Sequence, residues 1–224
     1  MRLISVLVAF HLAAACTDFN SPSELGDVQL LAVRASPKGI AGGERARLDF
    51  LIGGPGGLIS GAEPLWLVTD GLGTPAVGSV VLDAGEWFYQ APASVPEPSG
   101  VTLTLLVEAG GVQLNALKAI GIGVSEDNPT IADMVVSGQS VEADGDSIAV
   151  AGETFEVSAR IDPDPGETGQ LAWYSTIGVA DPIRGPVVTI EVDSERDTAQ
   201  GPLVVVGRDG FGGIAWKTAT LSRE

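Results

Sequence analysis

Few side chains of this chain could do covalent chemistry, and where they lie limits what that chemistry is. The 224 residues include one histidine, His11, and one cysteine, Cys16, both at the amino-terminal end. If the segment before Cys16 is removed, the remaining chain has no imidazole base and no pair of nitrogen and sulfur ligands. This excludes a Ser-His-Asp hydrolase, a Cys-His protease and a zinc site. We assign no catalytic residue and expect a protein that is not an enzyme.

Carboxylates are the reactive groups present in quantity, and two acidic clusters suggest calcium. Glu142, Asp144 and Asp146 stand at alternate positions, and residues 162–167 form a second acidic, proline-rich turn. Calcium takes six to eight oxygen ligands, of which one such turn supplies three or four. Glu142, Asp144 and Asp146 are therefore candidate calcium ligands. The alternative is a pair of solvated turns, because Asp and Gly are common turn formers.

The charge balance excludes one class of partner. The chain carries 29 acidic against 12 basic residues, a net charge of -17. Binding to a phosphate backbone requires clustered Lys and Arg, so we expect no nucleic-acid partner. The acidity serves solubility, or it recruits a cation or a basic partner.

Residues 1–15 have the pattern of an export signal. Arg2 precedes an apolar run from Leu3 to Leu12, and three alanines follow before Cys16. This order of a basic, an apolar and a small-residue region is that of a signal peptide. The apolar run is shorter than the ~20 residues of a membrane-spanning helix.

Residues 12–16, Leu-Ala-Ala-Ala-Cys, resemble the lipobox of bacterial lipoproteins, with Ala13 where leucine is usual. The resemblance implies a covalent lipid on Cys16, such as a diacylglycerol with palmitate chains, and attachment to a membrane. Thr17 in the next position favours the outer membrane, with the periplasmic or the outer face left open. Residues 16–26 are then the lipidated cysteine and a polar tether. The alternative is ordinary cleavage that leaves a soluble protein with a free thiol.

Two stretches of the chain repeat each other about 100 to 109 residues apart. Residues 41–44 (Ala-Gly-Gly-Glu) and 150–153 (Val-Ala-Gly-Glu) each open an alternating apolar run, and Trp66 and Trp173 follow at similar spacing. A period of two predicts half-buried strands, and six or seven short strands per hundred residues predict a β-sandwich. The fold class is all-β, with one sandwich over 27–124, a linker at 125–129 and a second sandwich over 130–224.

Aromatic and glycine-rich segments complete the prediction. We expect Trp66, Trp173 and Tyr89 in the cores, with residues 87–89 open to the alternative of an exposed aromatic platform. The face of Trp216 is undetermined. Residues 53–57 (Gly-Gly-Pro-Gly-Gly) predict a flexible loop, because no Gly-Lys-Ser/Thr follows to make a phosphate cradle.

Residues 87–93, Trp-Phe-Tyr-Gln-Ala-Pro-Ala, resemble the Tyr-x-Ala-Pro-Ala signature of bacterial immunoglobulin-like domains. The second half lacks this motif, and neither half has the paired cysteines of antibody domains. The whole arrangement is similar to surface lipoproteins of myxobacteria and related bacteria with tandem immunoglobulin-like domains.

The resemblance implies a location and a fold but no activity. We expect a structural, adhesive or protein-interaction module at the cell envelope with an envelope or surface protein as partner. The alternative is a polysaccharide- or calcium-binding surface module. The oligomeric state stays open.

Overall fold

The computed structural model of this chain describes residues 21–60, 63–71, 78–95, 97–192 and 198–224, with backbone only for 63–71. The predicted leader and Cys16 lie outside the described residues. Regular structure in the described part is strand, apart from one short 3-10 turn at Gly166–Thr168. No helix in this part is long and apolar enough to cross a membrane.

The described residues form nine strands in each half of the chain. The first half contains β1 (Gln29–Ser36), β2 (Gly39–Ile40), β3 (Arg45–Gly54), β4 (Gly57–Ile59), β5 (Glu63–Gly71), β6 (Ser79–Asp83), β7 (Glu86–Gln90), β8 (Ser99–Ala109) and β9 (Val112–Ile122). The second half contains β10 (Thr130–Val136), β11 (Gln139–Ser140), β12 (Asp146–Val150), β13 (Thr154–Asp162), β14 (Gln170–Ser175), β15 (Gly178–Asp181), β16 (Val187–Val192), β17 (Gln200–Arg208) and β18 (Ile214–Arg223).

The two halves have the same sheet order, which confirms the predicted fold class. In the first half, one sheet has the order β1-β3-β7-β6, with β4 beside β3, and the other has the order β2-β9-β8-β5. The second half repeats this order as β10-β13-β16-β15 and β12-β18-β17-β14, with β11 added beside β10 and no described counterpart of β4. The short strands β2 and β12 run parallel to β9 and β18, and the other paired strands are antiparallel. This is the ABED and GFC strand order of immunoglobulin-like sandwiches.

Alternating apolar residues fill each sandwich. In β13, Phe155, Val157, Ala159 and Ile161 are buried while the residues between them are exposed or half-buried. The core aromatics Tyr89 and Trp173 are fully buried, as expected. Trp66 lies in β5, and its side chain is outside the described residues.

The prediction of a flexible loop at residues 53–57 is wrong. Gly54 pairs with Gly57 across a tight turn, and β4 continues the hairpin to Ile59. Glycine suits this turn because Gly57 has a φ of 114°, which other residues rarely adopt. The glycines therefore mark a hairpin that lengthens one sheet of the first sandwich.

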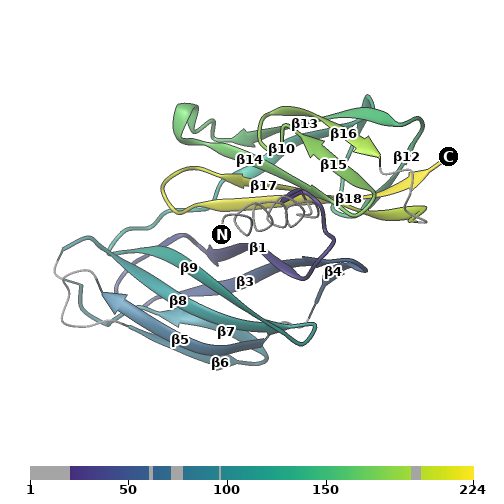
Figure 1. The fold of residues 1–224 in the computed structure, drawn as a ribbon. Helices are drawn as coiled ribbons and strands as arrows, with labels where there is room; N and C mark the ends of the chain where they lie inside the picture. The colour runs from purple at the N-terminus through teal and green to yellow at the C-terminus, as the bar shows by residue number, and fades with distance from the viewer. Residues whose placement is uncertain (1–20, 61–62, 72–77, 96, 193–197) are drawn as a thin grey trace, which may run out of the picture.

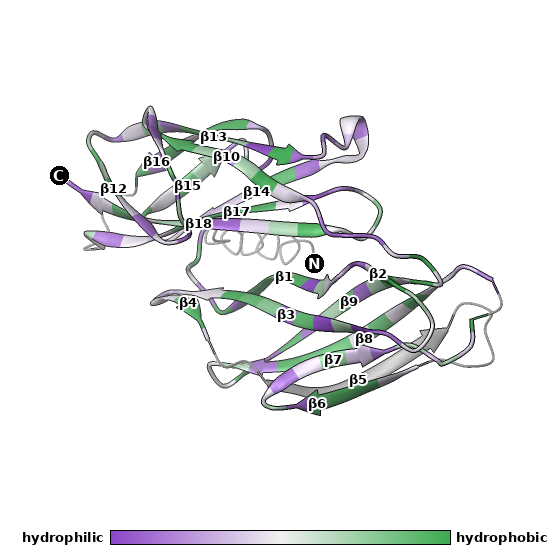
Figure 2. Cartoon of the chain, turned by 180° about the vertical axis from the view of Figure 1, so that it is seen from behind, coloured by the Kyte–Doolittle hydropathy of each residue, from purple (hydrophilic) through white to green (hydrophobic). Residues whose placement is uncertain are grey.

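The two sandwiches lie one above the other, with β17 and β18 of the second facing β1 of the first (Figure 1). A third apolar cluster, separate from the two sandwich cores, fills the space between them. Figure 2 shows the same stacking from behind, with apolar segments on both sides of the junction. The four sheets therefore form four layers, and the second and third layers meet through faces that would be outer faces in a single sandwich.

We expect Trp173→Ala to lower the free energy of unfolding by about 3–5 kcal/mol, because the indole fills the second core. The substitution also removes the bond from Trp173 Nε1 to Gly185 O (2.9 Å). Phe211→Ala is the control, because Phe211 is 74% exposed. Urea denaturation measures the free energy of unfolding of both variants. Equal small decreases for Trp173→Ala and Phe211→Ala would contradict the placement of Trp173 in the core.

Candidate binding surfaces at the junction of the two sandwiches

The apolar part of the junction joins the outer face of one sheet to the outer face of another. Leu31 and Leu51 of the first sandwich pack with Val204 and Val206 of the second. All four side chains are buried. Burying a leucine or valine side chain stabilises a protein by roughly 1.5–3 kcal/mol, so this contact holds the two sandwiches together.

Part of the segment expected as a free tether is packed into this junction. Leu25 is fully buried in the same cluster, and Ser23 is 1% exposed. Leu25 N donates to Ser175 O (2.9 Å) and Ser175 N donates to Ser23 O (2.9 Å), so the segment pairs with β14 of the second sandwich. Gly53 leaves room for this side chain, because a Cβ on Gly53 would lie 2.6 Å from Leu25 Cδ2 and would displace it. Residues 23–25 therefore bind both sandwiches before the chain enters β1.

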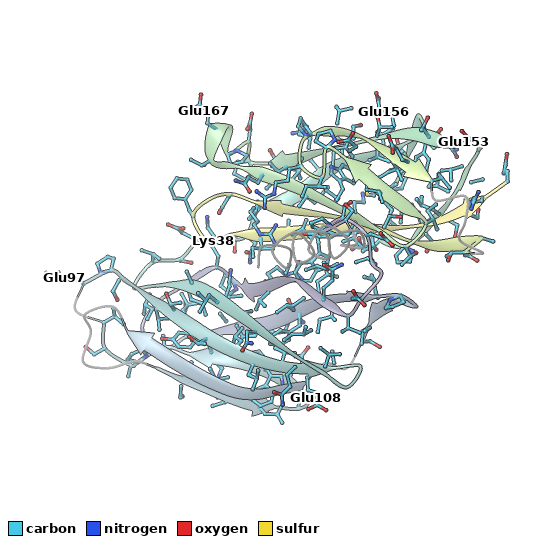
Figure 3. The ribbon with its side chains drawn as sticks, in the orientation of Figure 1. Lys38, Glu97, Glu108, Glu153, Glu156 and Glu167 are labelled. Atoms are coloured by element: carbon cyan, nitrogen blue, oxygen red, sulfur yellow. The ribbon has the colours of Figure 1, made fainter. Side chains whose placement is uncertain are left out.

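A polar network lies beside the apolar cluster. Asp209, at the end of β17, accepts from Lys38 Nζ (2.7 Å) with one carboxylate oxygen. The other oxygen accepts from the backbone N–H groups of Phe211 (2.7 Å) and Gly213 (2.8 Å). Lys38 also lies 3.5 Å from Glu126 of the linker. Figure 3 shows Lys38 between the sandwiches, while Glu97, Glu108, Glu153, Glu156 and Glu167 lie toward the outside.

The pair Lys38 and Asp209 stabilises the folded state through both pKa values. Burial alone would raise the pKa of Asp209, but the hydrogen bonds from Lys38, Phe211 and Gly213 outweigh it and lower the pKa. Burial alone would lower the pKa of Lys38, but the hydrogen bond and charge of Asp209, with help from Glu126, raise it. The stabilisation is therefore lost as the pH falls through the pKa of Asp209 or rises through that of Lys38.

The linker at 125–129 is also bonded to both sandwiches. Asn128 Nδ2 donates to Ala35 O (2.6 Å), and Asn128 Oδ1 accepts from Ile214 N (3.0 Å). Gly39 and Glu126 exchange two backbone hydrogen bonds (3.1 and 3.3 Å). One asparagine thus satisfies a carbonyl of β1 and an amide of β18 at once.

Lys118 is the unusual residue of the junction. It stands at an inward position of β9, is 2% exposed, and donates to Gly212 O in the β17–β18 hairpin of the other sandwich. Burial lowers the pKa of Lys118 to about 8; Asp209 opposes this shift and the positive charges of Lys38 and Arg208 add to it. A buried ammonium group whose pKa is close to neutral pH thus lies at the contact between the two halves.

One edge of β9 is open beside this contact. Gly121 N donates to Lys38 O (3.0 Å), which shows that odd-numbered residues of β9 point their backbone groups away from β8. No strand of the described residues pairs with this edge from Gln113 to Ala119. Leu117 is 73% exposed on it, and Phe211 is 74% exposed in the hairpin that touches Lys118. An unpaired edge with exposed apolar side chains is a template for another extended segment.

The corresponding edge of β18 in the second sandwich is closed, and the acidic turn closes it. Asp144 Oδ1 accepts from Thr218 N (3.0 Å), and Gly145 N donates to Thr218 O (3.0 Å). Asp146 Oδ2 accepts from Ala143 N (2.7 Å) within the same turn.

Two of the candidate calcium ligands, Asp144 and Asp146, thus each have one carboxylate oxygen bonded to a backbone N–H. Glu142 contributes its carbonyl, which accepts from Lys217 Nζ (3.3 Å). Within the described ranges, no three His, Cys, Asp or Glu side chains, Glu142, Asp144 and Asp146 included, form a group that could hold a metal ion.

The sequence contains a signal for the junction that is separate from the internal repeat. Lys118 occupies the apolar register of β9, where Leu114, Ala116, Ile120 and Ile122 are its neighbours on the same face. A charged residue in such a register indicates either a buried partner or a sheet edge. Trp216, whose face was undetermined, is half-buried at the junction with Arg34 above its ring at 4.0 Å.

Comparisons with known proteins place the chain only loosely. No protein-family model matches it, and no curated protein matches its sequence. Among solved structures, it is similar to the Ig1-2 module of the Drosophila receptor protein tyrosine phosphatase DLAR, at 14% identity and a TM-score of 0.30, over 88% of this chain and 99% of that one. It is also similar to the titin domains Z1Z2, solved in complex with telethonin, at 13% identity and a TM-score of 0.25, over 93% of this chain and 98% of that one. These scores carry no argument, so the fold assignment rests on the strand order.

We expect the stability difference between Lys118→Met and the unchanged chain to depend on pH. Because the pKa of Lys118 is about 8 when folded and 10.5 ordinarily, the unfolded chain binds the extra proton between these values. The unchanged chain therefore gains stability relative to Lys118→Met as the pH rises from 8 to 10.5, by about 3 kcal/mol at most. Urea denaturation at pH 7 and pH 10 measures the difference, and a constant difference would show that Lys118 is not buried as a cation.

Proposed function

We propose that this chain is a lipid-anchored, non-catalytic surface protein that binds another protein through the open edge of β9. The observation that carries the proposal is that edge, which is open to a partner from Gln113 to Leu117 and exposes Leu117. An edge strand gives affinity through main-chain hydrogen bonds and specificity through its side chains. The partner contributes one extended segment that extends the sheet β2-β9-β8-β5.

The charge of the chain favours a basic partner. The net charge is -17, and Glu108 is exposed opposite Gln113, at the far end of the edge from the linker. Opposite charges raise the rate of association and reject acidic competitors. A second copy of this chain would bring another -17, so the proposed occupant is a positively charged segment of a different protein.

The membrane anchor rests on the leader and on Cys16. The segment from Cys16 to Ser21 is short, and the chain is packed against both sandwiches from Ser23 onward. An anchor at Cys16 therefore holds the junction, and not a free end, near the membrane. With residues 16–22 extended at about 3.3–3.6 Å each, the junction stays within about 25 Å of the lipid.

We expect mass spectrometry of the mature amino terminus to show an acylated Cys16. Cys16→Ala should move the protein from the membrane fraction to the soluble fraction, because one thiol carries the anchor. An unmodified amino terminus with unchanged fractionation would remove the anchor from the proposal. It would not affect the assignment of the β9 edge.

We expect a photo-crosslinking residue at position 115 to capture one protein in cells, through an extended, positively charged segment identified by mass spectrometry. Asn115 is exposed and lies on the open edge. Adding Leu117→Lys should abolish the adduct, because the lysine removes the apolar contact and repels the basic segment.

The matched control places the same crosslinker at position 187. Val187 is 50% exposed and lies in β16 of the second sandwich, in the interior of its sheet. The same adducts from both positions, or no adduct from position 115, would refute the proposed edge. Retention of the adduct in the Leu117→Lys chain would refute it equally.

A further inference from the structure

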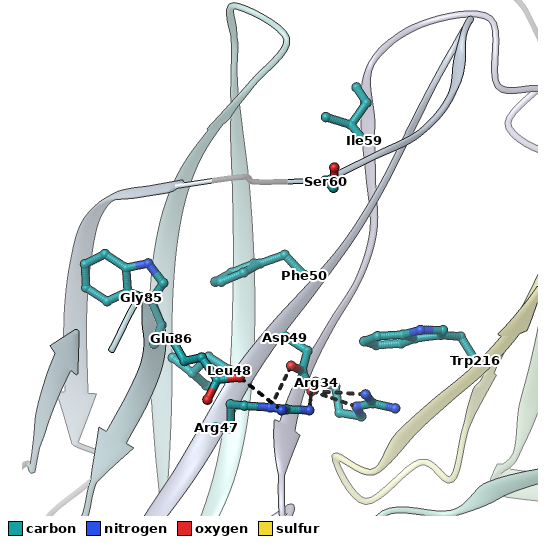
Figure 4. A pocket seen from close by; sticks show the side chains of 11 residues that line it. Arg34, Arg47, Leu48, Asp49, Phe50, Ile59, Ser60, Gly85, Glu86 and Trp216 are labelled. Atoms are coloured by element: carbon teal, nitrogen blue, oxygen red, sulfur yellow. Dashed lines mark hydrogen bonds and ion pairs between the residues drawn. The ribbon is translucent and has the colours of Figure 1, made fainter. Parts of the chain in front are cut away.

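The sheet of the first sandwich that faces the junction has a gap beside β3. The pairing of β7 with β3 ends at Leu48, and the pairing of β4 begins at Ile52. Between them, Phe50 has β1 on one side and no described strand on the other. A cleft of ≈ 320 Å³ occupies this gap and reaches across to Trp216 of the second sandwich (Figure 4).

The floor of the cleft combines an aromatic ring with a backbone peptide group, both of Phe50. Ala91 N donates to Glu44 O (2.9 Å), so even-numbered residues of β3 point their backbone groups toward β7. By this alternation the N–H and C=O of Phe50 point into the gap. The side chain of Phe50 is half-buried against the first core, which leaves part of its ring facing the cleft.

The rim of the cleft is strongly polar but carries no net charge. Arg34 donates to Asp49 Oδ2 through Nε (3.2 Å) and Nη2 (3.0 Å). Arg47 lies 2.9 Å from Asp49 Oδ1 and donates through Nη1 to Glu86 Oε1 (3.2 Å). Two guanidinium and two carboxylate groups thus form one chain of ion pairs, visible as dashed lines in Figure 4. They fix each other's position and leave further donor and acceptor sites for a ligand.

Two half-buried tryptophans complete the lining. Trp87 belongs to the first sandwich, and Trp216 carries Arg34 over its ring at 4.0 Å. The fully buried Trp173 has a hydrogen bond from its indole N–H to a carbonyl. For Trp87 and Trp216, no such bond joins the indole N–H to a described residue.

We infer that this cleft binds a neutral saccharide unit of one or two sugar rings. A sugar ring has apolar C–H faces that pack on aromatic rings, and it has hydroxyl groups that both donate and accept. The cleft offers the complementary set: Phe50 and two indoles, a peptide group, and paired planar ionic groups.

The other ligand classes fit less well. The four charged groups of the cleft sum to zero, so they do not attract an anionic ligand. An apolar ligand would remove water from these groups without replacing their hydrogen bonds with water. The volume is at the small end of the roughly 300–1,000 Å³ range of ligand sites, which fits one or two rings.

This inference is independent of the protein partner proposed at β9, and its test separates the two. The chain from Thr17 onward, which holds every described residue, is screened on an array of neutral and acidic glycans, and the hits are measured by calorimetry. We expect neutral glycans to bind. Glu86→Gln, at an exposed side chain, should weaken binding at least tenfold because it breaks the ion-pair chain at its end. Trp87→Leu should weaken it by as much or more.

Leu82→Ala is the matched control. Leu82 is 57% exposed on the neighbouring strand β6, opposite Trp87 in the pairing but outside the cleft lining. The Leu82→Ala and Leu117→Lys chains should bind neutral glycans with the affinity of the unchanged chain. Unchanged melting temperatures show that each variant is folded. Binding of acidic glycans alone, absence of any binding, or equal binding by Glu86→Gln and Trp87→Leu would overturn the inference.

Discussion

The arrangement of this protein depends on the burial of two outer sheet faces against each other. In a single sandwich, Leu31 and Leu51 on one sheet and Val204 and Val206 on another would face water. Here they form one apolar cluster with Leu25. Because this contact is non-directional, it sets how close the sandwiches lie but not their register. Hydrogen bonds have to supply the register.

Three polar contacts supply that register, each joining a different pair of elements. Asn128 joins β1 to β18, the Lys38–Asp209 pair joins the end of β1 to the β17–β18 hairpin, and Arg208 Nη2 donates to Leu31 O (2.8 Å). Buried polar groups are costly when they lose a partner, so a sliding of one sandwich over the other would leave several of them unpaired. The pieces that we connect to binding, the β9 edge and the Phe50 cleft, both border this junction and are therefore held in constant relation to each other.

The sequence was sufficient for the sandwiches and insufficient for the junction, for a physical reason. The alternation in β13 and the burial of Trp173 depend on contacts within one half, and a period of two reveals such contacts directly. The outward faces of β1 and β17 are also apolar, with Leu31, Ala32, Val204 and Val206 buried, so these strands are apolar on both faces. Such a run is compatible with a strand in any buried sheet, and nothing local says which surface covers its second face.

The difference between contacts within one half and contacts between distant segments also explains which predictions for individual residues agree with the structure. Spacing makes the acidic turn at 142–146 a calcium candidate, and in the fold Asp144 and Asp146 each place one carboxylate oxygen on a backbone amide, of β18 and of the turn respectively. Spacing shows which groups are near in sequence, but one of the donors, the amide of Thr218, comes from a strand more than seventy residues away. Leu25 shows the same effect for an apolar residue. The polar sequence around Leu25 predicts a tether, but its side chain is buried in the apolar cluster between the two sandwiches.

Lys118 limits how the open edge of β9 can be used. A lysine that points inward from an edge strand opposes sheet extension, because an added strand buries its charge further. The β17–β18 hairpin already covers this ammonium group and gives it the carbonyl of Gly212. Near the linker the hairpin thus occupies the space beside Lys118, where Gly212 lies against Ala119. The part of the edge left for a partner is the stretch from Gln113 to Leu117, and a strand that pairs there is confined to one register by the hairpin at its end.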